Sequence, residues 1–306
     1  MKKTAILFIS ALALFLPAVV YGAAGSSSGL ILIQPVCARA VAMGDAFSAV
    51  SDDINAVYYN PAGLLLYNRK EFSASYLKGV LDFSYYSAGF YSSFNNSYAL
   101  GGNLSAFSAG EAEINNVDGT SRNVTAMEDS VYTATLAKNL GGDFSAGANI
   151  KYINSAVAGE FKNEAYPLDI GLLYRKDNID KRIGIGLCIQ NLGGSLKTSA
   201  ADDEGEKLPQ VTRAGFSYTS RDEAKIVTFS ADALQLQEDP GLKIHMGLEY
   251  ALGGRLSLRA GYKAGYDLAS LTAGFGVEVN GANIDIAATM MGVLGYTYNV
   301  SISFKL

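Results

Sequence analysis

The strongest constraint on the fold is a regular alternation of apolar and polar residues from about residue 71 to the C-terminus. In the stretch RLSLRAGYK, Leu256 and Leu258 fall on one face of an extended chain, and Arg255 and Arg259 fall on the other. The stretches KIHMGLEY and SAGANIKY repeat the pattern. A period of two predicts β-strands with one apolar and one polar face. Two-sheet sandwiches and transmembrane barrels are both built from such strands.

The length and number of the alternating runs favour the barrel. The chain contains about fourteen runs of roughly 8–13 residues, close to the ~9–11 residues that a tilted strand needs to cross a membrane. They start near Phe72, Asp82, Ser97, Asp129, Asp143, Ala165, Lys181, Leu208, Lys225, Gly241, Arg255, Asp267, Ala282 and Gly295. We therefore predict an all-β fold with about fourteen antiparallel strands.

The connections between the runs separate by parity. Those after even-numbered runs are short, as at Asn95-Asn96, Gly141-Gly142 and Gly253-Gly254. The longest connections, 108–128, 156–164 and 194–207, all follow odd-numbered runs. Outer-membrane barrels have short periplasmic turns and longer outer loops, whereas a sandwich has no reason to sort its loops in this way.

The N-terminus carries the features of an export signal, which we assign to residues 1–22. Lys2 and Lys3 precede an apolar core, and Val20-Tyr21-Gly22 offers a small-residue cleavage site. No later segment has the ~18 uninterrupted apolar residues of a transmembrane helix, and charged residues make up only 17% of the chain, against ~25% in ordinary soluble domains. An exported, apolar, charge-poor chain without long apolar runs is typical of a barrel in the bacterial outer membrane.

Few residues suggest other chemistry. Loss of Lys2 and Lys3 with the signal peptide takes the net charge from −5 to −7. The mature protein is therefore a poor candidate for binding nucleic acid. Cys37 and Cys188 cannot form a disulfide framework, and we interpret both as isolated apolar residues rather than as a single bridge. His245 is the sole histidine and falls on the polar face of its run. We therefore expect no enzyme activity, no catalytic residue, no metal site and no cofactor.

The aromatic run FSYYSAGFYSSF, residues 83–94, has two readings. The favoured one is an aromatic girdle at the lipid boundary, and the other is the lining of a hydrophobic ligand path.

Residues 23–70 do not alternate, and we predict that they form a hatch, or plug, in the barrel of residues 71–306. A small-residue stretch with loose helical spacing ends at the sequence Asn60-Pro61-Ala62-Gly63. Proline cannot continue a helix and forces the residue before it into an extended conformation, while Gly63 permits a strained turn. The lumen of a fourteen-strand barrel is too wide for wall side chains to fill, so it can hold such a segment.

The segment PVCARAVAMGDAFSAVSDDINAVYYNPAGL resembles the N-terminal signature of FadL-type outer-membrane proteins. The resemblance is strongest to their PorV/PorQ branch, which includes related uncharacterised spirochaete-type proteins. The motifs of that family correspond here to Arg39, 42–44, Ala46-Phe47, Asp52-Asp53 and 60–64. The stretches QNLGG, LPQVTRAGFSY and LRAGYKAG are also similar to the family, so the match covers nearly the whole mature chain. The sequence departs from the family at Asp45, where the family has glycine.

The resemblance implies a fourteen-strand barrel with an N-terminal hatch at Asn60, Pro61, Ala62 and Gly63. FadL members pass fatty acids and other hydrophobic compounds, which gives the leading function. PorV members instead serve type IX secretion and deliver cargo proteins to the cell surface, which gives the alternative of a non-transporting scaffold or shuttle. The expected partners are outer-membrane lipid and either a hydrophobic small molecule or a secreted cargo protein.

Two further expectations come from the residues themselves. Arg39, as a buried arginine, should be paired. Polar-face wall residues such as Arg213 and Arg259 either hold the hatch, in part through Asp52 and Asp53, or pair with other wall residues, as is common in polar barrel interiors. The last run, GYTYNVSISFKL, is similar to the signal read by the barrel assembly machinery. It departs from the usual pattern because it ends in Leu306, which leaves Phe304 as its last aromatic residue.

Overall fold

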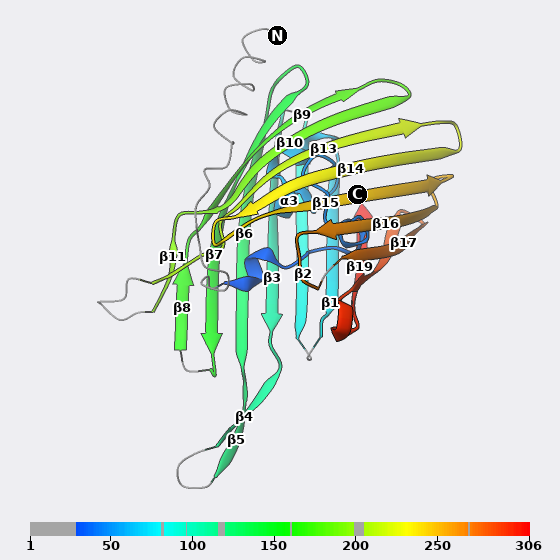
Figure 1. The fold of residues 1–306 in the computed structure, drawn as a ribbon. Coiled ribbons are helices and arrows are strands. Elements are labelled where there is room, and N and C mark those ends of the chain that lie inside the picture. Colours follow the sequence, from blue (N-terminus) through cyan, green and yellow to red (C-terminus); the bar gives the residue numbers. More distant parts are fainter. Residues whose placement is uncertain are drawn as a thin grey trace.

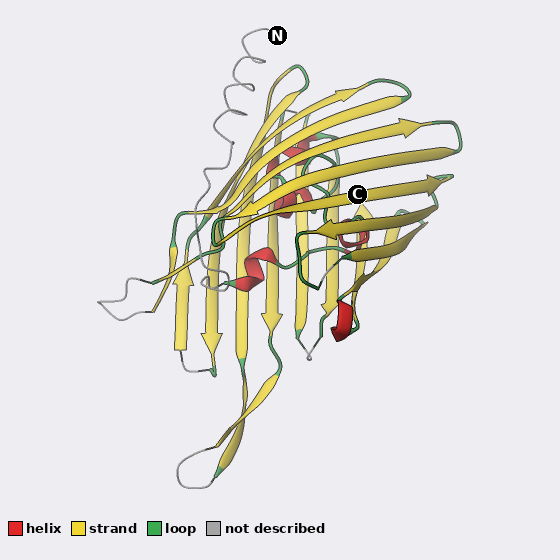
Figure 2. Cartoon of the chain, in the orientation of Figure 1, coloured by secondary structure: helices red, strands yellow, loops and turns green. Residues whose placement is uncertain are grey.

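The computed structural model is a closed barrel of antiparallel strands that surrounds the N-terminal part of the chain (Figures 1 and 2). The structure describes residues 29–306 except 81–82, 96, 116–119, 160, 199–204 and 269. The signal peptide assigned to residues 1–22 lies outside the described residues. Within the described part of the chain, no helix is long and apolar enough to cross a membrane.

Fourteen strands form the wall, and each pairs with its two neighbours. They are β1 (Lys70–Lys78), β2 (Ser84–Phe94), β3 (Tyr98–Ser108), β6 (Met127–Gly141), β7 (Phe144–Val157), β9 (Leu168–Asp177), β10 (Lys181–Leu192), β13 (Val211–Arg221), β14 (Lys225–Leu236), β15 (Asp239–Leu252), β16 (Leu256–Ala264), β17 (Leu271–Val279), β18 (Ala282–Met290) and β19 (Tyr296–Lys305). Antiparallel pairing of β1 with β19, in the register Glu71 with Lys305, closes the ring. The predicted fold class is therefore confirmed, and every predicted strand start falls within four residues of an observed one.

Five short strands escaped prediction because they lie inside the long connections. The hairpin of β4 (Glu111–Asn115) and β5 (Ser121–Thr125) projects beyond the wall (Figure 1). Strands β8 (Phe161–Ala165), β11 (Ser195–Thr198) and β12 (Glu206–Lys207) pair with one another and with β7. Runs of two to five residues are too short for a period-two pattern to stand out. All five belong to one end of the barrel, called the long-loop rim below; the opposite end is the short-turn rim.

The two faces of the wall differ as the alternation requires. In β19, Tyr296, Tyr298 and Val300 are exposed on the outer surface, whereas Asn299 and Ser301 are buried. The aromatic residues of β2 divide in the same way. Exposed side chains there are those of Tyr86, Phe90 and Phe94, and buried ones are those of Tyr85 and Tyr91. Neither reading of this run is complete, since half of it faces outward and half packs inside the barrel.

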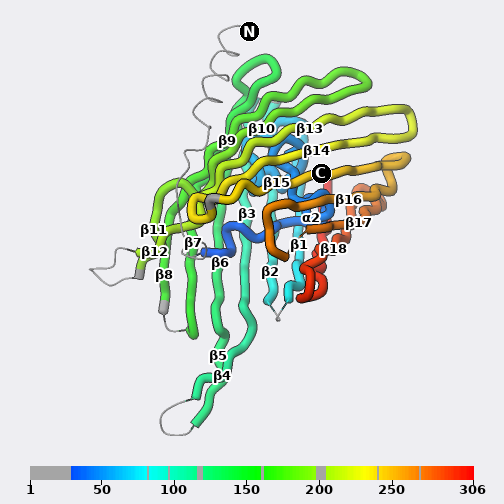
Figure 3. Tube along the Cα trace, viewed as in Figure 1, coloured from blue at the N-terminus to red at the C-terminus, as the bar shows by residue number. Residues whose placement is uncertain are grey.

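The N-terminal segment, residues 29–66, lies inside the barrel as a series of short helices joined by turns (Figures 1 and 3). These are η1 (Leu30–Ile33), α2 (Ala38–Ala42), α3 (Ala56–Tyr59) and η2 (Pro61–Leu65); a further turn, η3 (Gly292–Leu294), joins β18 to β19. Helix α2 contacts β16 to β19, and η2 contacts β2, β3, β6, β7 and β9. The segment therefore touches widely separated parts of the wall.

Candidate functional site

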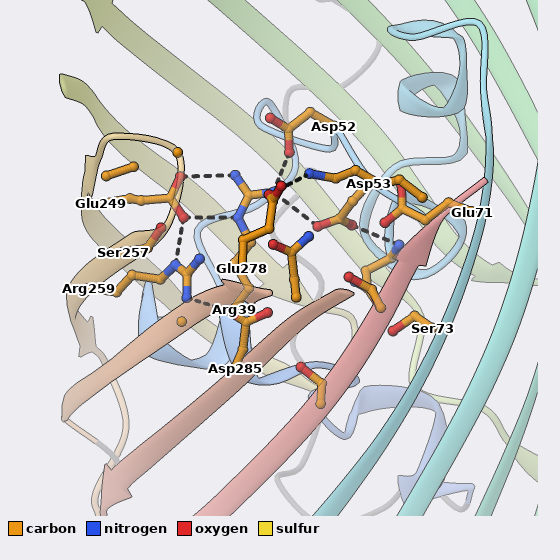
Figure 4. A pocket seen from close by; sticks show the side chains of 18 of the residues that line it. Arg39, Asp52, Asp53, Glu71, Ser73, Glu249, Ser257, Arg259, Glu278 and Asp285 are labelled. Atoms are coloured by element: carbon orange, nitrogen blue, oxygen red, sulfur yellow. Dashed lines mark hydrogen bonds and ion pairs between the residues drawn. The ribbon is translucent and has the colours of Figure 1, made fainter. Parts of the chain in front are cut away.

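Arg39, on α2, joins the N-terminal segment to the wall near the short-turn rim (Figure 4). Its Nε and Nη2 donate to the Glu249 carboxylate of β15 at 2.9 and 3.0 Å. Its Nη1 donates to Asp52 Oδ1 at 2.6 Å and to Asp53 Oδ2 at 3.0 Å. One guanidinium thus engages three carboxylates, and the fork geometry of arginine permits the bidentate contact to Glu249.

The network continues along the wall through Arg259 of β16. Its Nε donates to Glu249 Oε2 at 2.5 Å, and its Nη1 donates to Asp285 Oδ1 at 2.6 Å. These bonds join wall to wall, so Arg259 supports the Glu249 carboxylate that Arg39 binds rather than bonding the N-terminal segment itself. The segment reaches the wall a second time through Asp52, whose Oδ2 lies 3.7 Å from Arg182 Nη1.

Asp52 and Asp53 differ in their electrostatics although they are adjacent. Burial raises the pKa of Asp52, but the Arg39 guanidinium outweighs this effect and holds the pKa well below its usual range. Burial also raises the pKa of Asp53, and there the nearby Asp52 charge adds to burial and outweighs Arg39. The two pKa values are therefore shifted in opposite directions, and the Asp52 carboxylate is the one that Arg39 stabilises more strongly in its charged form.

These side chains line a polar cavity of about 240 Å³ at the short-turn rim (Figure 4). Arg69 closes one side, since its Nη2 donates to Glu71 Oε2 at 2.6 Å and to the Asp52 carbonyl at 3.0 Å. Most charged groups of this cavity, among them Arg39, Asp52, Glu249 and Arg259, are thus paired with one another. Such an arrangement holds chain segments together and leaves little for an apolar ligand to bind.

Asn60 is buried and ties the predicted gating residues to the wall. Its Nδ2 donates to the Ser48 carbonyl at 3.0 Å and to the Leu172 carbonyl of β9 at 3.1 Å, while its Oδ1 accepts the Ala62 amide at 3.2 Å. Its backbone is extended, as Pro61 at the start of η2 requires. The expectation for Gly63 needs a correction, because its φ is not positive; a Cβ there would lie 2.1 Å from the Ser51 carbonyl oxygen, so close contact requires glycine.

A belt of wall glycines, which sequence analysis did not identify, faces the N-terminal segment. A Cβ on Gly261 of β16 would lie 2.1 Å from the Gly44 amide nitrogen, and one on Gly186 of β10 would lie 2.2 Å from the Ser48 carbonyl oxygen. On Gly147 of β7 it would lie 2.4 Å from the Pro61 carbonyl carbon. Backbone therefore packs on backbone around the lumen. These glycines occupy polar-face positions of their strands, which was the available sequence signal.

A second cavity, called the upper chamber here, lies toward the long-loop rim and has a volume of about 130 Å³. Twelve residues line it, five from the N-terminal segment and seven from the wall and its connections: Ile33, Pro35, Asp45, Tyr58, Tyr59, Val211, Arg213, Leu234, Leu236, His245, Lys263 and Tyr266. Arg213 Nε donates to Gln190 Oε1 at 2.7 Å, and its guanidinium lies 5.8 Å from the centre of the Tyr59 ring. The predicted site residues thus lie at two ends of the lumen, with Arg213 separate from the Arg39 network.

The structure explains why aspartate can replace the family's glycine at Asp45. It has φ +60°, a conformation that favours glycine and that aspartate tolerates better than most residues. Its carboxylate accepts the Tyr59 hydroxyl at 2.6 Å and forms an ion pair with Lys263. Burial raises the pKa of Asp45, but Lys263 outweighs this and lowers it overall.

The two cysteines and the histidine singled out from the sequence are all buried. Cys37 and Cys188 are both free and buried, as interpreted from the sequence. His245 is buried, and its Nε2 lies 2.9 Å from the Tyr266 hydroxyl.

The comparisons with known proteins agree on the type of fold. A family model described as "Type IX secretion system protein PorV" matches residues 23–236. No curated protein matches the chain.

Several solved structures are similar to the chain. They include the Pseudomonas putida toluene transporter TodX, with a TM-score of 0.56 and 12% identity over 94% of this chain and 99% of that one. The CymD monoaromatic hydrocarbon channel has a TM-score of 0.55 and 12% identity over 88% and 96% of the two chains. A Pseudomonas aeruginosa FadL homologue has a TM-score of 0.52 and 11% identity over 89% and 98%. At such identities the similarity is one of fold.

Proposed function

The chain belongs to the family of the type IX secretion system protein PorV, and we propose that it acts as a plugged outer-membrane scaffold for protein secretion. Its fold and family are those of bacterial outer-membrane barrels. In this proposal the N-terminal segment is a fixed plug, and the long-loop rim receives a secreted protein on the cell surface.

The observation that carries this proposal is the fit between the plug and the wall. Backbone atoms of the plug would lie within 2.1–2.4 Å of a Cβ on Gly261, Gly186 and Gly147, on three separate strands. Cavities beside the plug have volumes of about 240, 130 and 20 Å³, below the ~300–1,000 Å³ of typical ligand pockets. The largest of these is lined mostly by charged groups that are paired with one another. Such close packing against the wall favours a plug that stays in place over one that moves each time a molecule passes.

A reversible lock on the plug tests the proposal. A Cβ on Gly101 of β3 would lie 3.3 Å from Val57 Cγ2 of α3, so cysteines at these two positions are within disulfide reach. The lock variant is Val57→Cys with Gly101→Cys in a chain whose Cys37 and Cys188 are replaced by alanine. The two single-cysteine chains are the matched controls.

The readout is capture of secreted proteins from culture medium of the native host by the barrel in lipid nanodiscs, with and without reductant. We expect the locked and reduced barrels to capture the same proteins equally. Capture that needs reduction of the lock would contradict a fixed plug.

The second candidate is the passage of a hydrophobic small molecule, which the apolar part of the upper chamber favours. Leu234 and Leu236 of the wall face Ile33 and Tyr58 of the plug there. Passage through the lumen requires the plug to move, so the lock should stop it and reductant should restore it. Uptake of a labelled hydrophobic probe into vesicles that contain the lock variant distinguishes the two candidates.

A further inference from the structure

The upper chamber contains a buried arginine that lacks a carboxylate partner. Arg213 is 5% exposed. Within the described residues, the one hydrogen bond of its guanidinium is the Nε bond to Gln190, and Nη1 has no partner. Arginine is rarely buried unless it is paired, because removing its charge from water is costly. An unpaired guanidinium at the wall of a cavity therefore indicates a place for an anion.

Among the described residues, neither neighbouring carboxylate forms a hydrogen bond or an ion pair with Arg213. Asp45 is paired with Lys263, so these two charges cancel within the chamber. Asp232, on the adjacent strand β14, uses its Oδ2 to accept the Phe47 and Ser48 amides at 3.1 and 2.9 Å. Its Oδ1 forms no hydrogen bond with Arg213 or with any other described residue. Among the charged residues that line the chamber, Arg213 thus supplies one net positive charge.

The remaining lining limits the rest of the ligand. Ile33, Pro35, Val211, Leu234 and Leu236 supply apolar surface. Burial raises the pKa of Tyr266 to about 12, so it remains a neutral hydroxyl. The volume of about 130 Å³ is close to the ~150 Å³ of an engineered cavity that binds benzene. The ligand should therefore carry a small apolar body about the size of one aromatic ring.

We infer that the upper chamber binds a small monocarboxylate with an apolar body, of the size of benzoate or a short-chain acid, through the guanidinium of Arg213. The carboxylate supplies the acceptor that Arg213 Nη1 lacks, and the ring or chain packs on Leu234, Leu236 and Ile33. The site lies between the plug and the long-loop rim, so the ligand arrives from the cell exterior. This inference concerns binding alone and does not depend on the secretion role proposed above.

The test uses the full mature chain in nanodiscs and 4-fluorobenzoate as the probe, followed by fluorine NMR. The matched neutral probe is 4-fluorobenzamide, which has the same shape without the charge. We expect 4-fluorobenzoate to bind, unlabelled benzoate to displace it, and the amide to bind at least about 10-fold more weakly, because only the carboxylate forms an ion pair with the guanidinium.

Four variants assign the binding to the chamber. Arg213→Gln should weaken 4-fluorobenzoate binding by about 10-fold to 100-fold, whereas Arg255→Gln, at the opposite rim, should leave it unchanged. Asp45→Asn frees Lys263 and should strengthen binding. If Arg213→Gln does not fold, Leu234→Phe, which fills the chamber, should abolish binding in its place. Absence of binding at ~10 mM, equal binding of the amide, or full affinity in Arg213→Gln or Leu234→Phe would each overturn the inference.

Discussion

The packing of the N-terminal segment's backbone on wall glycines makes Gly261→Ala an informative substitution. The added Cβ would lie 2.1 Å from the Gly44 nitrogen and 2.5 Å from the Met43 carbonyl carbon. Ordinary contact begins at 3.4 Å, so one backbone must move by about 1.3 Å relative to the other. Because both contacts are backbone atoms, no side-chain rotation relieves them.

The expected cost follows from these distances. Overpacking a tight site costs about 1–3 kcal/mol, and a backbone contact belongs at the upper end of that range. Replacing glycine by alanine stabilises by about 0.4–1 kcal/mol through the unfolded chain. We therefore predict that Gly261→Ala lowers the free energy of unfolding by about 2 kcal/mol.

The matched control is Gly102→Ala in β3. Gly102 lies among the outward-facing residues Leu100 and Leu104, and its added Cβ would meet only the Thr133 carbonyl oxygen, at 3.2 Å. We expect Gly102→Ala to change the free energy of unfolding by less than about 1 kcal/mol, because the loss of conformational freedom in the unfolded chain stabilises the barrel while the slight contact with the carbonyl oxygen destabilises it.

The assay is urea unfolding of the barrel refolded into lipid vesicles. The chain has no tryptophan, so Tyr298→Trp, on the outer surface of β19, supplies the fluorescent reporter in every variant. Equal stability of the Gly261→Ala and Gly102→Ala barrels would refute the idea that the wall glycines seat the plug.

Three further predictions use the same unfolding assay. Arg39→Ala removes the partner of Glu249 and Asp52, and we expect it to lower the free energy of unfolding by about 2–4 kcal/mol. This is somewhat below the ~3–5 kcal/mol lost when a fully buried pair is broken. A loss under about 1 kcal/mol would mean that the network does not hold the N-terminal segment in place. Asp52 has a lowered pKa in the folded state, so its contribution is present above the ordinary pKa of aspartate and is lost as the pH falls below about 4; Asp52→Asn should therefore flatten the decline in unfolding free energy between pH 6 and pH 3, and an unchanged slope would contradict this. Asn60→Ala leaves the Leu172 and Ser48 carbonyls without their donor and should cost about 1–3 kcal/mol, whereas Asn154→Ala, a substitution in β7, serves as the comparison and should cost less.

The wall was predictable from the sequence because its alternation is local. A residue such as Leu258 faces the membrane and its neighbour Arg259 faces the lumen, and this difference is visible in the residues themselves. Local turn chemistry also located the short connections, for example at Gly253-Gly254. The short strand β8 was missed because five residues in a long polar connection carry no such pattern.

The contacts of the N-terminal segment depend on long-range geometry and could not be predicted from the local sequence. Pairing of Arg39 with Glu249 joins residues 210 positions apart, and nothing in the local sequence selects Glu249 among the polar-face wall residues. Gly261 looks like an ordinary strand glycine in the sequence, and only the position of Gly44 in the structure shows why a side chain does not fit there. Asp45 stood out as a departure from the family motif, but only its φ of +60° and its contact with Lys263 explain it.

Native mass spectrometry of the protein, extracted gently from its own outer membrane, is the most direct test of the proposed role in secretion. We expect a barrel that carries a stoichiometric protein partner. A barrel that carries a hydrophobic molecule of a few hundred daltons and no protein partner would contradict it.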